Sequence, residues 1–223
     1  NIGFFSLFFA DAITVQLPAY KSQYPFFLQK KIFVINNFIK KPLKKYTAPN
    51  LNSNKVSMLG RLCAQKNYEP ILDQLSSHKG SDIELMIAGD GEFSTFLKNK
   101  YKKIIQKKKL FLLGNIKNID NFLSGSTIYC MSSQWEGYPN SLAEALRMCL
   151  PIVISKRFVD LKEFVEHDVN GLIVSDNDYI DAIIYLLENK SLLSKMSMES
   201  YKKYSNLCLS KPSIDWYGLI KKK

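Results

Sequence analysis

Residues able to bind a phosphorylated sugar gather in two stretches of this sequence. Glu136 and Glu144 have seven residues between them, the first in a predicted loop and the second in the opening turn of a predicted helix. Carboxylates accept hydrogen bonds from sugar and ribose hydroxyls, and a helix N-terminus between them offers N–H groups to a phosphate. Arg61 and Lys66 follow an earlier predicted strand, where a guanidinium fork and an ammonium point charge suit a diphosphate. Together these groups fit a sugar nucleotide without requiring a metal ion.

Glycine-containing turns follow two of the predicted strands. Gly60 allows a sharp turn directly before the first of the two cations. Gly89 begins the run Gly-Asp-Gly-Glu, whose glycines let a ligand approach closely and whose acids suit the N-terminus of the next helix. A third strand ends near Asn115 and Ile116, where main-chain groups are suited to reading a base.

Ordinary structural roles compete with these assignments. Arg61 and Lys66, each taken alone, are more typical of surface cations than of a binding site. Ser141-Leu-Ala-Glu144 matches a capping box, in which the glutamate binds the N–H of the serine. Both a structural and a ligand-binding role therefore stay open for Glu144, whereas Glu136 has no such local partner.

No metal site or nucleophilic triad is expected. Asp176-Asn177-Asp178 matches the DxD pattern that other transferases use to hold a divalent cation, but its place at the start of a predicted helix favours N-capping. His78 and His167 fall near predicted helix ends and are expected at the surface. The four cysteines are widely spaced without a CxxC pair, which argues against zinc and for a reducing cytoplasm.

Short apolar runs alternate with helical patterns along most of the chain. The predicted strands span residues 55–59, 83–88, 110–113, 127–131, 151–155 and 171–174. The predicted helices span residues 68–78, 92–107, 118–124, 141–149, 160–167, 178–189, 191–208 and 213–222. This alternation predicts an α/β fold with a parallel sheet covered by helices on both faces. Such sheets bind ligands at the carboxyl ends of their strands, which is where the candidate residues stand.

Charge and hydrophobicity narrow the function classes. With 223 residues, 46% of them hydrophobic, the chain has enough apolar side chains for one full core and a smaller piece. The net charge of +11 comes almost wholly from lysine, which suits a solvated surface or attraction to an anionic membrane. The sequence contains no combined aromatic and basic motif of the kind that indicates nucleic-acid binding. The apolar stretch 2–10 is far shorter than the roughly 20 residues that span a bilayer, and we interpret it as the buried end of an interrupted domain.

In their order along the chain, these motifs resemble the family 4 glycosyltransferases. The matching elements are Gly60-Arg61-Leu62 with Lys66-Asn67, Gly89-Asp90-Gly91, Glu136-Gly137-Tyr138-Pro139-Asn140, Glu144-Ala145, Pro151-Ile152-Val153-Ile154-Ser155 and Asn170-Gly171-Leu172-Ile173-Val174. The E-x7-E element is specific in this context, and the resemblance covers roughly residues 31–223. It implies a GT-B fold, in which two Rossmann-like domains face each other across a cleft and the C-terminal one holds the nucleotide sugar.

The resemblance assigns roles to the candidate residues. Arg61 and Lys66 would bind the diphosphate, Glu136 the donor sugar and Glu144 the ribose, and the expected catalytic residues are Glu136, Arg61 and Lys66. The expected substrate-binding residues are Gly60, Arg61, Lys66, Gly89, Asn115, Ile116, Glu136, Gly137, Tyr138, Pro139, Asn140, Ser141, Leu142 and Glu144. The two cations and the helix dipole would stabilise the charge that develops on the diphosphate.

The resemblance also implies an activity. It predicts a retaining enzyme that moves a hexose or N-acetylhexosamine from a nucleotide sugar, typically a UDP-sugar, to a glycan acceptor in surface polysaccharide biosynthesis. The acceptors typical of the resembled family and the positive charge of the chain favour a lipid-linked acceptor. They also favour a cytoplasmic location and peripheral contact with the inner face of the membrane. No cofactor is expected, because the nucleotide sugar is a co-substrate. Two alternatives stay open: a non-catalytic donor-binding or interaction module, whether an inactive fragment or one subunit of a split enzyme, and a sugar-nucleotide epimerase, against which the E-x7-E spacing argues.

The resemblance divides the chain into unequal parts. Residues 1–40 match a remnant of an N-terminal acceptor-binding domain, 41–52 a linker, 53–208 the nucleotide-sugar-binding domain and 209–223 a C-terminal helix that packs back toward the N-terminal domain. We therefore expect exposed apolar surface on the N-terminal piece and a separate partner that supplies the acceptor domain. Two further departures are Cys149, where the family usually has glycine, and Lys156-Arg157-Phe158-Val159, where it often has a Gly-Gly pair.

Overall fold

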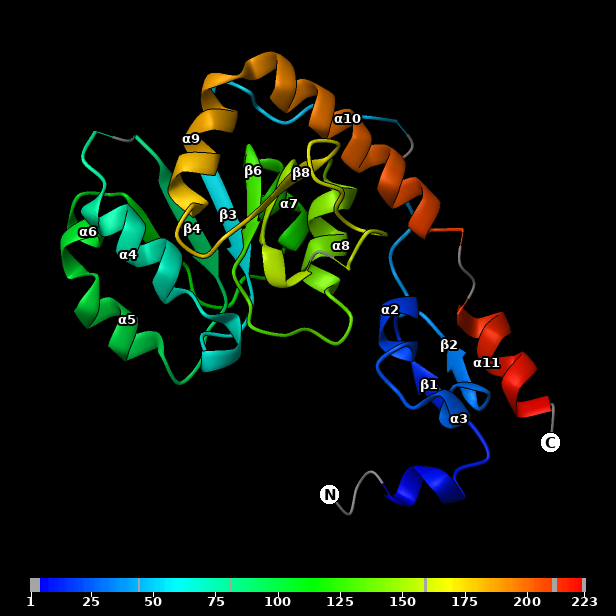
Figure 1. Cartoon of the computed structure of the whole chain (residues 1–223). Coiled ribbons are helices and arrows are strands. Elements are labelled where there is room, and N and C mark those ends of the chain that lie inside the picture. The colour runs from blue at the N-terminus through cyan, green and yellow to red at the C-terminus, as the bar shows by residue number, and fades with distance from the viewer. Residues whose placement is uncertain (1–4, 44, 81, 159, 210–211, 222–223) are drawn as a thin grey trace.

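A doubly wound parallel sheet forms the core of the chain. A computed structural model describes residues 5–43, 45–80, 82–158, 160–209 and 212–221 (Figure 1). Val159 and the outermost residues of both expected terminal segments lie outside this described part. The six strands of the main sheet are β3 (Lys55–Leu59), β4 (Glu84–Ala88), β5 (Leu110–Leu112), β6 (Ile128–Met131), β7 (Ile152–Ser155) and β8 (Gly171–Val174). Each lies within one residue of its predicted bounds.

The order of the strands across the sheet decides where a ligand binds. It is β5-β4-β3-β6-β7-β8, with every neighbouring pair parallel. The first strand of this sheet along the chain, β3, thus lies in the middle. Strands β4 and β5 follow on one side of β3, and the chain then crosses to β6, β7 and β8 on the other side. Ligands of such sheets bind outside the carboxyl ends of the strands at the point where the order reverses. The segments that follow β3 and β6 therefore border the expected crevice.

Helices cover both faces of the sheet. One face packs against α4 (Glu69–Ser77), α5 (Ser94–Lys100), α6 (Lys102–Gln106) and α9 (Tyr179–Glu188), and the other against α7 (Ile119–Ser124), α8 (Asn140–Arg147) and the end of α10 (Lys190–Leu207) (Figure 1). Within β6, Ile128 and Cys130 face the first layer, and Tyr129 and Met131 face the second. All four side chains are buried, as in a parallel sheet covered on both sides.

Two of the helix predictions are wrong. Residues 160–167 form turns after a short 3-10 helix at Lys156–Phe158. The fully buried Asn170 accepts a hydrogen bond from the N–H of Glu166 and donates one to the carbonyl of Phe164, both at 2.9 Å, which occupies backbone groups that a helix would use. The single helix predicted over residues 92–107 is divided into α5 and α6 at Tyr101, because the backbone there leaves the helical region and the ring enters the core.

Helix α8 ends in a turn that favours glycine but contains Cys149. The N–H of Cys149 donates to the carbonyl of Leu146 at 2.9 Å, and the N–H of Leu150 donates to that of Ala145 at 3.1 Å. These two bonds define a Schellman motif, whose left-handed residue is usually glycine. Cys149 has a φ of 60°, where a Cβ atom costs about 1–2 kcal/mol. The departure from glycine at this position is therefore accompanied by backbone strain, and the thiol itself is fully buried.

A smaller parallel sheet forms the N-terminal segment. It pairs β1 (Ile13–Val15) with β2 (Ile32–Val34), and the chain between them contains α2 (Pro18–Lys21) and α3 (Phe26–Gln29). The expected apolar surface is present, since Phe9 is 89% and Phe26 is 76% exposed. Burial of the apolar stretch is wrong for residues 5–10, because η1 (Leu7–Phe9) buries no side chain and Phe8 stacks on Phe27 at 5.4 Å instead.

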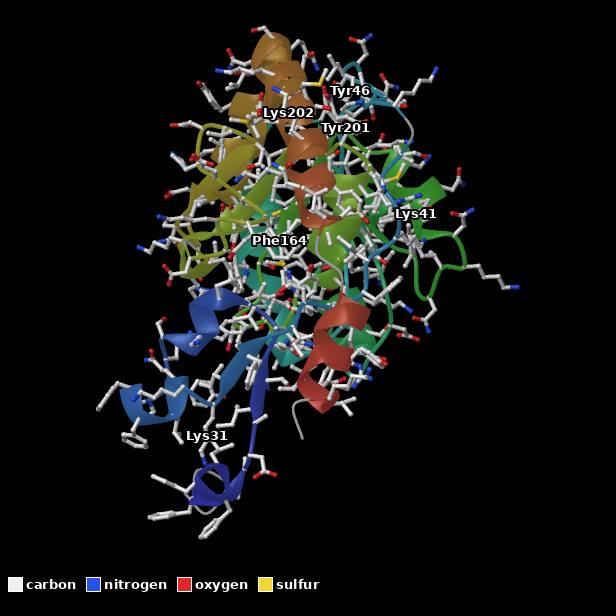
Figure 2. All side chains as sticks on the ribbon, turned by 90° about the vertical axis from the view of Figure 1, so that its right-hand side faces the viewer. Lys31, Lys41, Tyr46, Phe164, Tyr201 and Lys202 are labelled. Atoms are coloured by element: carbon white, nitrogen blue, oxygen red, sulfur yellow. The ribbon has the colours of Figure 1, made fainter. Side chains whose placement is uncertain are left out.

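The two ends of the described chain lie near the same end of the molecule. Figures 1 and 2 both place α11 (Pro212–Lys221) and the N-terminal segment, which contains the labelled Lys31, below the main sheet. The division of the chain into domains remains a prediction. Among the described helices, none combines the length and the apolar character that crossing a bilayer requires.

Candidate active site

A cavity of about 570 Å³ opens where the strand order reverses. It lies at the carboxyl ends of β3 and β4, and the loop after β6 and the first turns of α8 form its other side. Its walls are Leu59, Gly60, Arg61, Lys66, Ala88, Gly89, Asp90, Asn115, Ile116, Ile119, Glu136, Tyr138, Asn140, Ser141 and Glu144. Both stretches of candidate residues therefore meet in one space, although Lys66 and Glu136 are 70 positions apart in the sequence.

Most of the predicted binding residues line this cavity, and three do not. Gly137, Pro139 and Leu142 are absent from its walls, and Leu142 is fully buried in the core beneath α8. The side chain of Leu142 thus contributes to packing and not to the cavity surface. Leu59 and Ala88 were missed, although each is the last residue of a strand, a position that the topology of parallel sheets singles out. That the lining residues bind a ligand remains a prediction.

Lys66 and Glu136 form an ion pair inside the cavity. The Lys66 Nζ and Glu136 Oε1 atoms are 2.7 Å apart, and the two side chains are only 15% and 8% exposed. Ser133 donates a second hydrogen bond of 2.6 Å to the same carboxylate oxygen. Two residues that the sequence assigned to different parts of a ligand are thus in direct contact. The Glu136 carboxylate therefore accepts hydrogen bonds from both Lys66 and Ser133, and the Lys66 ammonium is fixed beside it.

The two strand-end glycines permit the close packing that forms the cavity floor. Gly60 has a φ of 151°, and a Cβ atom there would lie 2.5 Å from the Cε atom of Lys66. Gly89 has a φ of 142°, and a Cβ atom there would lie only 2.0 Å from the carbonyl oxygen of Gly60. The N–H of Gly89 donates to the carbonyl of Gly114 at 2.8 Å, so that three neighbouring strand ends are tied together. The absence of a side chain at Gly60 lets Lys66 pass over the turn and reach Glu136.

Arg61 is the uncompensated cation of the cavity. Its side chain is exposed, and it makes no hydrogen bond or ion pair with any residue of the described part of the chain. Asp90, on the neighbouring turn, accepts a hydrogen bond from the N–H of Gly91 at 2.8 Å. The expected place of the acids at the next helix N-terminus is wrong, because α5 begins at Ser94 and has no acidic residue in its first turn. A guanidinium without a protein partner beside a crevice is suited to bind an anionic group in a bidentate manner.

The predicted capping box at α8 is wrong. The helix begins at Asn140, its N-cap is Pro139, and no side chain caps it. Ser141 and Glu144 are therefore the second and fifth helical residues, whereas a capping box needs its serine at the cap and its glutamate at the third position. The cap therefore lies at Pro139, two residues before Ser141, because the restricted φ of proline suits the boundary. The structural alternative for Glu144 is thereby removed.

The first turn of α8 presents an N–H group to the cavity. The N–H of Asn140 donates to the carbonyl of Tyr138 at 2.8 Å, and that of Leu142 donates to the carbonyl of Pro139 at 3.0 Å. The N–H of Ser141 has no backbone acceptor among the described residues, and Ser141 lines the cavity. A helix N-terminus with such a group attracts phosphate through both its donor and its partial positive charge.

Glu144 lies half-buried at the rim of the cavity. Burial raises the pKa of its carboxyl, the Lys40 ammonium lowers it, and the Asp120 carboxylate raises it, with a net upward shift. Asp120 itself is partly buried, which raises its pKa, but hydrogen bonds from Arg147 at 2.7 Å and Lys40 at 3.3 Å hold that pKa below its ordinary value. The carboxylate of Glu144 makes no hydrogen bond within the described residues, and it is therefore free to accept one from a ligand hydroxyl.

The DxD-like segment has local partners. Asp176 accepts hydrogen bonds from Ser155 at 2.9 Å and from the Arg157 guanidinium at 2.5 Å. Asp178 is the N-cap residue of α9, but its side chain binds the hydroxyl of Ser175 at 2.5 Å instead of a helix N–H, so side-chain capping is wrong here. Across the part of the chain that the structure describes, no three His, Cys, Asp or Glu side chains form a group suited to a metal ion.

The comparison with protein families agrees with this geometry. The sequence profile described as "Glycosyl transferases group 1" matches residues 40–203, which include every residue of the cavity wall. The chain belongs to the group 1 glycosyltransferases. The cavity of this group 1 glycosyltransferase lies within the matched region, and residues 1–39 precede that region.

Individual relatives extend this assignment. A UDP-Gal:alpha-D-GlcNAc-diphosphoundecaprenol alpha-1,3-galactosyltransferase of Escherichia coli is 31% identical over 163 residues, which are 70% of this chain and 42% of that protein. An uncharacterized glycosyltransferase of Haemophilus influenzae is 27% identical over 183 residues, which are 80% of this chain and 52% of that protein. The chain thus spans about half the length of these curated relatives.

A solved structure confirms the fold. The pneumococcal O-GlcNAc transferase GtfA, crystallised with UDP and GlcNAc, superposes on this chain with a TM-score of 0.76 at 18% sequence identity. The match covers 96% of this chain and 44% of GtfA. The predicted GT-B-type arrangement of a parallel sheet between helix layers is therefore confirmed.

Proposed function

We propose that this chain is the donor-binding part of a retaining, family 4 glycosyltransferase that transfers a hexose or N-acetylhexosamine from a UDP-sugar. The observation that supports this most directly is the shared cavity, where Arg61, the Lys66–Glu136 pair and the N-terminus of α8 face one space. Its volume of about 570 Å³ is typical of a site for a ligand of this size. Two phosphates need cations and N–H groups, sugar hydroxyls need carboxylates, and the cavity supplies both.

Each group has a distinct part in the proposed reaction. Arg61, Lys66 and the start of α8 bind the diphosphate, Glu136 the transferred sugar and Glu144 the ribose. The bond between the anomeric carbon and the diphosphate oxygen breaks, and the acceptor hydroxyl forms the new bond on the same face. The hydroxyl proton moves to the departing diphosphate oxygen, so that charge and atoms balance. The two cations and the helix dipole stabilise the negative charge that develops on the leaving group. We propose that the reaction needs no metal ion.

The acceptor and the location follow from relatives and from charge. The Escherichia coli relative acts, by its name, on a diphosphoundecaprenol-linked sugar, and this favours a lipid-linked glycan acceptor in surface polysaccharide biosynthesis. The net charge of +11 favours peripheral contact with an anionic membrane on its cytoplasmic face. The chain spans about half the length of these curated relatives, and the proposed transfer also needs an acceptor-binding domain.

A second candidate function is a donor-binding module without activity of its own. The exposed rings of Phe9 and Phe26 favour this alternative, since they show that the N-terminal segment presents an uncovered apolar surface. Such a chain would bind the same donor but would release sugar only together with a partner. Binding and transfer therefore have to be measured separately.

The donor site is tested by calorimetric titration with UDP, UDP-galactose and UDP-N-acetylglucosamine. We expect Arg61→Ala to weaken UDP binding by about 10- to 100-fold, because hydrogen bonds to a charged group contribute about 1.5–3 kcal/mol. Lys98→Ala is the matched control, since it removes one exposed positive charge on α5, away from the cavity. We expect it to change UDP affinity by less than about twofold. A folded wild-type chain that binds no UDP would overturn the proposal.

A further inference from the structure

The N-terminal segment contacts the loop that carries Glu136. Tyr20, on α2, donates its hydroxyl to the carbonyl oxygen of Glu136 at 2.6 Å. Burial, and then the Glu136 carboxylate, raise the pKa of this phenol, so that it stays a donor at neutral pH. In a trans peptide the carbonyl and the following N–H point in opposite directions. By holding the carbonyl of Glu136, Tyr20 therefore also turns the N–H of Gly137 away from the N-terminal segment.

A chain of three side-chain amides makes a second connection. Gln16 Nε2 donates to Asn37 Oδ1 at 2.7 Å, and Asn37 Nδ2 donates to Asn140 Oδ1 at 3.1 Å. In each bond an amide N–H donates to the amide oxygen of the next residue. The Oδ1 atom of Asn140 is therefore an acceptor in this chain, and its Nδ2 group is left as a donor. Asn140 is the first residue of α8 and lines the cavity. The chain of amides thus ends in a donor at the wall where phosphate or sugar oxygens would lie.

The close approach of the two segments depends on a residue without a side chain. A Cβ atom at Gly137 would lie 3.0 Å from the Oε1 atom of Gln16, a tighter contact than side chains normally make. Glycine at this position lets the N-terminal segment lie directly against the loop. The N-terminal segment therefore contacts the loop through both Gln16 and Tyr20.

We propose that Gln16, Tyr20 and Asn37 are positioning residues that hold the Glu136–Asn140 loop in the geometry that binds the donor sugar. This inference rests on the proposed function, because it assigns the loop to the donor. None of the three residues lines the cavity, so they act through Glu136 and Asn140. The N-terminal segment then belongs to the donor site, in addition to any part that it plays in acceptor binding.

Titration of Tyr20→Phe with UDP and with UDP-N-acetylglucosamine tests the first connection. The change removes one hydrogen bond, with a net contribution of about 1 kcal/mol, and we expect about fivefold weaker binding of the UDP-sugar. Affinity for UDP alone changes by less than about twofold, because the diphosphate and ribose contacts stay intact. Tyr24→Phe is the matched control, since Tyr24 lies on the same segment but its hydroxyl makes no hydrogen bond to the Glu136–Asn140 loop among the described residues, and it changes neither affinity. Equal losses for UDP and the UDP-sugar, or no loss, would overturn the positioning role.

The amide chain is tested by combining substitutions. Asn37→Ala weakens UDP-sugar binding in the wild-type background but has no further effect in the Asn140→Ala background, because Asn37 acts only through Asn140. A loss of the same size in both backgrounds would show that Asn37 acts in another way and would overturn this part of the inference.

A measurement without ligand separates this inference from the proposed function. In the ligand-free chain, Tyr20→Phe speeds hydrogen exchange of the amides at residues 136–138, 140 and 141, and Tyr24→Phe does not. Unchanged exchange in Tyr20→Phe would overturn the positioning role even if UDP binds. Absence of UDP binding by the wild-type chain would remove the donor assignment, and the inference would fall with it.

Discussion

The ion pair between Lys66 and Glu136 stabilises the ligand-free cavity. Its atoms are 2.7 Å apart, and the two side chains are 15% and 8% exposed. Lys66→Met keeps an aliphatic stem over Gly60 but leaves a nearly buried carboxylate whose one remaining side-chain donor among the described residues is the hydroxyl of Ser133. Removing one partner of a buried pair costs about 3–5 kcal/mol, and the remaining exposure lowers this. We expect Lys66→Met to reduce the free energy of unfolding by about 2 kcal/mol.

The reverse change is expected to cost less. Glu136→Gln leaves the ammonium of Lys66 at the end of a flexible chain that reaches water, and we expect a loss of about 1 kcal/mol. The double variant removes both charges, so its loss is smaller than the sum of the single losses by at least about 1 kcal/mol.

Urea unfolding of the wild type, both single variants and the double variant at neutral pH measures this coupling. A nearly buried pair is screened little by salt, so the coupling persists at high ionic strength. Additive losses, or a coupling that disappears on adding salt, would refute the reasoning.

Two further predictions concern α8. Cys149→Gly and Cys149→Ala both remove the thiol, but only glycine adopts a φ of 60° without strain, so thermal unfolding should show the glycine variant to be more stable by about 1 kcal/mol; the opposite order would contradict a strained turn. Burial raises the pKa of Glu144 above its unfolded value, so its contribution to stability is present at acidic pH and is lost as the pH rises through the folded pKa. Glu144→Gln should therefore raise the melting temperature at neutral pH, with the gain vanishing toward pH of about 4 in calorimetric scans, whereas a gain independent of pH would contradict this cause.

Local signals in the sequence were sufficient for the six strands of the main sheet and for the chemical types at their ends. Strands that are buried on both faces read as short apolar runs, and Gly60 and Gly89 mark the turns that follow them. Since the carboxyl ends of parallel strands share one edge, Arg61 and Glu136 were expected at a common site before their distance was known. Helix boundaries were less certain. The N-cap of α8 is Pro139, whereas the capping-box alternative placed it at Ser141. Serine caps through its side chain and proline through its restricted φ, so the sequence left this boundary open.

Only the tertiary structure decided which groups touch. The order of strands around β3 and β6 is a long-range property, and no local pattern records it. The same holds for the pair of Lys66 with Glu136 and for the bond from Tyr20 to the Glu136 loop, which join positions 70 and 116 residues apart. Periodicity predicts the strands and the glycine turns, because both depend on neighbours in the chain, but it predicted burial wrongly for residues 5–10. The partners of a charge depend on how the sheet is wound, and that is settled only when distant segments pack together.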